Sequence, residues 1–247
     1  MRESRGGGYC YLPGLVFASQ AVLASPGMVI ERACFPACLP LAEGFEAVRA
    51  ALERFDRPLA ALCGFDLRLP AARRLEDFVA FNGDYLAQLR SWGLLEGDDS
   101  PLARTNVAPI RGGVSEPGVL GFSYTVVRDS PARTFVVSGV PEVPDDASGP
   151  DDVVRLGESS PGALREKLEF VTKMLKRRFA ALDTEWSDDA SIHLYTAHDA
   201  GSALLEILGL QGIHPVFGVT WHEAAPPVDL LELEIDVRRY ARETVIG

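Results

Sequence analysis

The chain has 247 residues, of which 47% are hydrophobic, and its formal net charge is −11 at pH 7. This length and composition suffice for one large core or two modest ones. The excess of acidic residues argues against nucleic acid or anionic membranes as partners, because both would repel the chain. No apolar run reaches the roughly 18 residues of a membrane span, and the first residues lack the order of a signal peptide, so we expect a cytoplasmic protein.

The four cysteines all lie in the first quarter of the chain, which otherwise gives little structural indication. Cys34 and Cys38 are separated by three residues with no histidine nearby in the sequence. That spacing does not by itself predict a metal site, and in a cytoplasmic protein we expect reduced thiols. We therefore predict neither a metal ion nor a disulfide here.

Helices and strands alternate in the predicted first half. Apolar residues recur three or four positions apart from Phe45 to Leu59, which is typical of one buried helix face. A short strand follows and ends at Pro70, a second amphipathic helix is predicted over residues 75–95, and residues 103–110 predict a strand.

The second half predicts a similar order of elements. Two strands over residues 121–140 precede an acidic loop, and Ser160-Pro161 then begins a helix with a long apolar stripe. A strand, a short helix and two more strands complete the chain. In the last strand, Glu232, Glu234 and Asp236 alternate with apolar residues and share one face.

This repeated order predicts an α+β fold in which the helices cover one face of a mixed sheet. Turn-forming residues between Gly112 and Gly118 mark the expected boundary. We therefore predict two domains, 1–117 and 118–247, with the start of the first departing from the pattern.

Several short segments resemble the Rid (YjgF-type) family. "GFSYTVV", "TFVVSG" and the closing "PVFGVTWHEAAPPVDLLELEIDV" are similar to its first and last strands, and "DFVAFNGDY" and "PLARTNV" are similar to its asparagine-bearing helix and arginine-bearing strand. The resemblance spans roughly residues 40 to 240. It implies a tandem of two chorismate-mutase-like domains, a homo-oligomer with a trimer favoured, and hydrolysis of enamines or imines without a cofactor.

The resemblance also implies a role for particular residues. Arg104 falls on the arginine that binds the substrate carboxylate, and Glu232 falls on the glutamate that positions water or transfers a proton. The second half has Phe217 at the arginine position, and the first half has no acid at the glutamate position. This departure leaves two interpretations: one composite site where the halves meet, or two pockets that have both decayed. The other expected lining residues are Asn82, Asn106, Tyr124, Ser138 and Gly139.

Residue chemistry supports this assignment for Arg104, because a guanidinium presents a planar fork that fits a carboxylate and remains charged at any working pH. Each residue also has an ordinary alternative. Arg104 could be a solvated charge at a strand end, Glu232 one of three solvent-facing acids, and Asn82 a surface amide.

Three functions remain open from the sequence. The first is a Rid-type hydrolase, deaminase-like, that acts on a small carboxylated imine or enamine. The second is a chorismatase-like enzyme acting on chorismate or a related enol-ether acid, since chorismatases also look like fused Rid-type halves. The third is a non-catalytic ligand-binding module. None of the three requires a metal or another cofactor.

Overall fold

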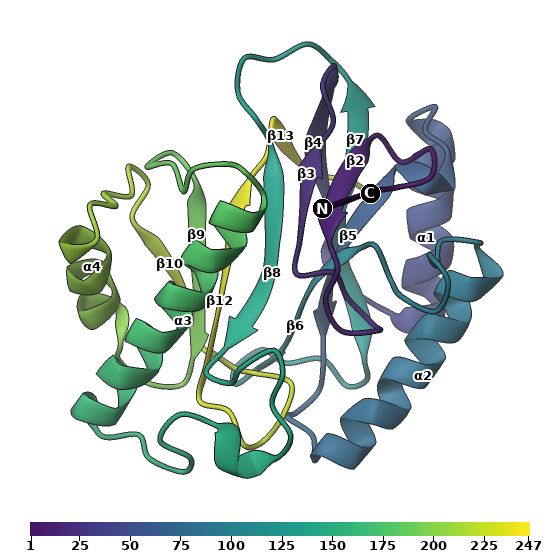
Figure 1. The fold of residues 1–247 in the computed structure, drawn as a ribbon. Coiled ribbons are helices and arrows are strands. Elements are labelled where there is room, and N and C mark those ends of the chain that lie inside the picture. The colour runs from purple at the N-terminus through teal and green to yellow at the C-terminus, as the bar shows by residue number, and fades with distance from the viewer.

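Two mixed β-sheets pack against each other, and two helices cover the outer face of each sheet in the computed structural model, which describes residues 1–247 (Figure 1). The predicted α+β class is confirmed. None of the helices is both long and apolar enough to cross a membrane.

The six-stranded sheet is built mainly from the first half of the chain. Its strands lie in the order β11 (Ala224–Ala225), β6 (Ala103–Pro109), β5 (Leu62–Arg68), β7 (Gly118–Val127), β4 (Met28–Pro40) and β13 (Arg242–Val245). Helices α1 (Leu41–Arg54) and α2 (Leu75–Ser91) bury their apolar faces on it. The periodic residues Phe45, Val48 and Leu52 are all buried in α1, as the spacing predicts.

The seven-stranded sheet has the order β1 (Arg2–Glu3), β2 (Tyr9–Leu12), β3 (Ala21–Ala24), β8 (Phe135–Pro141), β12 (Leu233–Arg239), β9 (Ser191–Thr196) and β10 (Val219–His222). Helices α3 (Pro161–Ala181) and α4 (Gly201–Leu210) pack on its outer face. The Ser160 hydroxyl accepts a hydrogen bond from the backbone N–H of Ala163, which caps the start of α3 where Ser-Pro predicts it.

The strand order repeats between the two sheets. In the first sheet, elements that come along the chain as β4-α1-β5-α2-β6-β7 give the spatial strand order β6-β5-β7-β4. In the second sheet, elements that come along the chain as β8-α3-β9-α4-β10-β12 give the corresponding spatial order β10-β9-β12-β8. Each repeat contains one parallel pair, β5 with β6 and β9 with β10. Because β7 lies between β5 and β4, the repeat favours a boundary in residues 128–134. The division at 117/118 stays a prediction.

Both ends of the chain cross to the other sheet. β3 pairs with β8, and the C-terminal β13 pairs in parallel with β4. The poorly patterned first forty residues therefore form three strands of one sheet and a long strand of the other. This exchange ties the two sheets together at their shared interface.

Charged residues also link the sheets. Arg238 of β12 contacts Asp66 of β5 at 2.7 Å and Asp236 at 2.6 Å, and all three side chains are buried. Burial alone would raise the pKa of Asp66, but Arg238 and Arg32 outweigh it and hold that pKa well below its usual range. These charged side chains connect β5 of one sheet with β12 of the other.

Candidate active site

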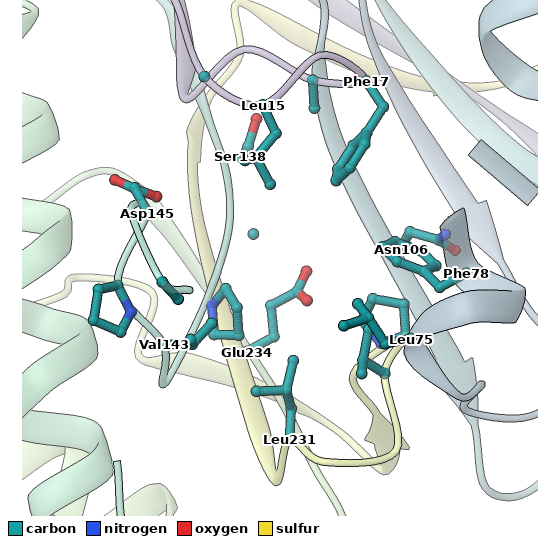
Figure 2. Close-up of a pocket in the computed structure, with 18 of the residues that line it drawn as sticks. Leu15, Phe17, Leu75, Phe78, Asn106, Ser138, Val143, Asp145, Leu231 and Glu234 are labelled. Carbon is teal, nitrogen blue, oxygen red and sulfur yellow. The ribbon is translucent and has the colours of Figure 1, made fainter. Parts of the chain in front are cut away.

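A cavity of about 370 Å³ lies where β6 of one sheet passes β8 and β12 of the other (Figure 2). Side chains of β6, β8 and β12 form its floor. The segment 14–20, the start of α2 and the loops 141–153 and 227–231 form its walls. Most of its lining is apolar, so the few polar groups within it are poorly solvated and their interactions with a ligand are strengthened.

Arg104 of β6 lines this cavity and has no carboxylate partner. Its side chain is buried, and its Nη1 donates to Oδ1 of Asn82 at 2.8 Å. The guanidinium lies over the rings of Phe17, Tyr85 and Phe78, with its central carbon 4.5, 4.9 and 5.7 Å from the three centroids. Burial lowers the pKa of Arg104 to about 10, which leaves it charged at neutral pH. A buried, uncompensated cation of this kind is suited to bind an anion.

Glu234 of β12 is the acid of the cavity. Its side chain is only 4% exposed, and its carboxyl group makes no hydrogen bond within the protein. Figure 2 shows the carboxyl group projecting into the middle of the cavity. Burial and the nearby Asp236 raise the pKa of Glu234 to about 8, although Arg104 and Arg178 oppose this shift. A carboxyl group in this range can both donate and accept a proton near neutral pH.

Two further polar side chains complete the floor. Asn106 is buried beside the cavity, and neither its amide nitrogen nor its amide oxygen has a hydrogen-bond partner in the protein. An unpartnered buried amide is costly unless a ligand or water satisfies it. The Ser138 hydroxyl instead has protein partners, since it donates to the Ser19 carbonyl at 2.6 Å and accepts from the Arg104 backbone N–H at 3.0 Å.

The structure brings together only some of the expected site residues. Arg104, Asn106, Ser138 and Gly139 line the cavity, whereas Asn82 lies behind Arg104 and orients it. Glu232 lies outside the cavity, because it comes just before β12 and turns toward His198, 2.8 Å away.

Two other expected residues lie away from this cavity. Tyr124 donates to Glu31 at 3.2 Å, because β7 pairs with β4 and places this tyrosine against a separate, smaller cavity. Phe217 is exposed in the turn before β10 and reaches neither cavity.

Residues 1–244 match the family described as "2-aminomuconate deaminase CnbZ". A relative from Comamonas testosteroni, described as a 2-amino-5-chloromuconate deaminase, is 36% identical over 244 residues, which are 97% of this chain and 96% of the relative. The chain belongs to the CnbZ family. It is therefore a deaminase-type enzyme, and the expected membership of the Rid (YjgF-type) family is wrong. The motifs behind that expectation are single strands and helices, too short to separate families with similar element order.

Solved structures with a similar fold are far more distant in sequence. A chorismatase aligns with a TM-score of 0.52 at 10% identity over 89% of this chain and 77% of its own. A cyanuric acid hydrolase from A. caulinodans aligns with a TM-score of only 0.43 at 11% identity. The chorismatase shows that the CnbZ chain shares its fold with a known structure, and sequence identity this low transfers no activity.

The sequence analysis missed Glu234 and the wall contributed by residues 14–20. In the strand expected from the sequence, Glu234 and Glu232 share one face. The alternation of polar and apolar residues therefore could not distinguish which of the two acids lines the cavity. The 14–20 segment has no regular structure in which periodicity could place Phe17. No three His, Cys, Asp or Glu side chains gather to ligate a metal ion, and Cys34 and Cys38 are free, half-buried thiols.

Gly139 of β8 provides the space for the Glu234 carboxyl group. A Cβ atom built on Gly139 would lie 1.7 Å from Glu234 Oε1, so Gly139→Ala must displace the carboxyl group. We expect kcat of the deaminase to fall at least about tenfold, because proton transfer depends on that placement. Steady-state kinetics check this, with Gly162→Ala as the control, since no atom lies within 4 Å of its added Cβ. Equal kinetics for Gly139→Ala and wild type would contradict the placement.

A fully buried ion pair supports the start of β12. Lys167 Nζ lies 3.0 Å from Glu142 Oε1, and the same carboxylate accepts the backbone N–H groups of Glu232 and Leu233. Lys167→Met leaves this carboxylate buried without its cation, so we expect the free energy of unfolding to fall by about 3–5 kcal/mol. Urea denaturation measures the change.

The exposed Lys173 on the same helix provides the matched control, and Lys173→Met should change stability by no more than about 0.5 kcal/mol. The double variant Lys167→Met/Glu142→Gln should recover part of the loss. A single variant as stable as wild type would show that Glu142 does not need its lysine.

Proposed function

We propose that this chain hydrolyses 2-aminomuconate, or a derivative substituted on its carbon chain, to the 2-oxo acid and ammonia in the cavity of Arg104 and Glu234. The observation that carries the proposal is a buried arginine without a protein carboxylate beside a buried glutamic acid whose pKa is raised to about 8. The full-length similarity to a deaminase of 2-amino-5-chloromuconate supports this substrate class.

The substrate named by this family suits these groups. 2-Aminomuconate is a six-carbon diene with a carboxylate at each end and an amino group on carbon 2, so it is an enamine. Arg104 binds the carboxylate next to the amino group and so places carbon 2 and carbon 3 near Glu234. The apolar walls contact the diene, and Asn106 offers its unpartnered amide to the amino group or to the attacking water.

Glu234 transfers protons in each step of the proposed reaction. Protonated Glu234 donates to carbon 3 while the nitrogen lone pair forms a C=N bond at carbon 2. The Glu234 carboxylate then takes a proton from water as the water oxygen attacks carbon 2. Glu234 returns that proton to nitrogen, the C–N bond breaks, and the hydroxyl proton goes back to Glu234 as C=O forms. The balance is one enamine and one water giving one 2-oxo acid and one ammonia.

We also propose that the two repeated sets of elements are chorismate-mutase-like units, which the repeated strand order and the fold shared with the chorismatase support. The site then combines Arg104 of the first unit with Glu234 of the second. The homotrimer and the cytoplasmic location stay predictions.

Ammonia release from 2-aminomuconate tests the proposed function. The purified protein should release ammonia and the 2-oxo acid in equal amounts and faster than heat-inactivated protein does. Chorismate, followed by loss of its ultraviolet absorbance, is the control for the alternative enol-ether chemistry. Turnover of chorismate without turnover of the enamine would overturn the proposal, and turnover of neither would favour a binding module.

A further inference from the structure

A second buried arginine lines the cavity, and the proposed reaction does not use it. Arg178 of α3 is 6% exposed, and its Nη1 donates to the carbonyls of Ser138 and Gln20 at 3.2 and 3.3 Å. Its Nη2 contacts Asp145 at 2.8 Å, and its Nε has no partner. The guanidinium therefore has one charged partner, and its Nε is left without an acceptor.

The partners of the two arginines lie on opposite sides of the acid. Arg104 packs on Phe78, and Arg178 pairs with Asp145. Figure 2 shows Phe78 on one side of the cavity and Asp145 on the other, with the Glu234 carboxyl group between them. Both arginines lower the pKa of Glu234, so both charges act on its carboxyl group. A ligand that spans the cavity past Glu234 would meet a cation at each end.

Asp145 is a partner that a ligand could replace. It belongs to the loop after β8, and its side chain is 36% exposed, whereas Arg178 is buried. Its other contact is a hydrogen bond from the Gln20 side chain at 3.2 Å on the surface. Asp145 can thus turn to solvent when another carboxylate takes its place on Arg178, while Arg178 is held by two carbonyls.

We propose that Arg178 anchors a second carboxylate, so that the cavity selects dicarboxylic acids over monocarboxylic acids of the same length. The distal carboxylate of the ligand replaces Asp145 on Arg178, while the proximal carboxylate binds Arg104. This inference rests on the proposed function for the identity of the substrate, but the binding preference is measured without turnover.

The test compares trans,trans-muconate with sorbate by isothermal titration calorimetry. Both are planar six-carbon dienes that carry a carboxylate at one end. The other end is a second carboxylate in muconate and a methyl group in sorbate. Neither has an amino group, so neither is deaminated. We choose a pH of about 6.5, below the pKa of Glu234, because an ionised Glu234 would repel both ligands.

We expect wild type to bind muconate about tenfold or more tightly than sorbate, in line with a charge-assisted hydrogen bond. Arg178→Gln should remove this preference and leave the Kd of sorbate unchanged. Asp145→Asn should enlarge the preference several-fold, because Arg178 then has no protein carboxylate to release.

Two results would overturn the proposal. One is equal binding of the two ligands by wild type. The other is an Arg178→Gln variant that weakens both ligands by the same factor, as a purely structural brace would do. If Arg178→Gln does not fold, Asp145→Asn provides the test. A ratio of the Kd values of sorbate and muconate that is the same in Asp145→Asn as in wild type would reject Arg178 as the anchor. A wild type that prefers muconate yet releases no ammonia from 2-aminomuconate would reject the proposed function and keep the anchor.

Discussion

Replacing Arg104 with alanine is expected to lower kcat/KM for 2-aminomuconate by about 10²–10³. A charge-assisted hydrogen bond to a carboxylate contributes about 1.5–3 kcal/mol, and loss of the fixed substrate orientation adds to that. Because the carboxylate next to the amino group sets the position of carbon 2, we expect kcat to fall as well as KM to rise. Initial rates of ammonia release over a range of substrate concentrations separate the two effects.

A second variant of Arg104 tests the importance of the size and planarity of its guanidinium. Arg104→Lys keeps a positive charge but loses the fork and its packing on Phe17 and Tyr85, so its activity should lie between alanine and wild type. Arg111, an exposed arginine just beyond the same strand, provides the control. If Arg104→Ala keeps the kinetics of Arg111→Ala while both fold, the substrate carboxylate binds elsewhere.

Local patterns predicted most of the helices and central strands. The periodic faces of α1 and α3 are buried, and the strands expected over residues 62–70 and 103–110 correspond to β5 and β6. The helices have one buried face, which a period of 3.6 reveals, whereas β5 and β6 are buried along almost their whole length and are recognised as short runs between helices. β4 could not be found in this way, because its thirteen residues include a register irregularity between Cys34 and Leu39 that interrupts the alternation.

The exchange of chain ends was also beyond local patterns. Nothing in the residues of β13 indicates that they pair with β4, some two hundred positions earlier, and β3 gives no sign of its pairing with β8. Such pairings join segments far apart in the chain, and local periodicity carries no information about them.

The candidate site shows the same limit at the level of single residues. Arg104 stands out in the sequence because a charge interrupts an apolar strand, and the structure leaves it buried without an acid. The choice between Glu232 and Glu234 depends on the register of β12 against β8, where Glu234 lies opposite Pro141. A register between strands ninety residues apart is a tertiary property, and a shift of two residues exchanges one acid for the other.

Glu234→Gln is expected to lower kcat by about 10²–10⁴, the range for loss of a general acid–base group. The amide keeps the size of the side chain and cannot donate a proton to carbon 3. Glu232→Gln is the matched control two residues earlier in the chain, and because Glu232 lies outside the cavity we expect near wild-type kcat. Equal losses in the two variants would contradict the assignment of Glu234.

The pH dependence gives a sharper test of Glu234. The first proposed step needs the protonated acid, so kcat/KM of wild type should fall as the pH rises through about 8, and the residual activity of Glu234→Gln should lack this limb.

The folding stability of the protein should also depend on the ionisation of Glu234. The pKa of Glu234 in the folded state lies above the usual 4.5. The favourable contribution of its protonated form to folding stability is therefore complete below about pH 4.5 and is lost as the pH rises toward and through about 8. Thermal melts at about pH 5 and pH 9 should therefore show Glu234→Gln gaining stability relative to wild type at the higher pH, while it loses activity at both. A glutamate that merely supported the fold would produce the opposite pairing, in which the variant is less stable than wild type at every pH.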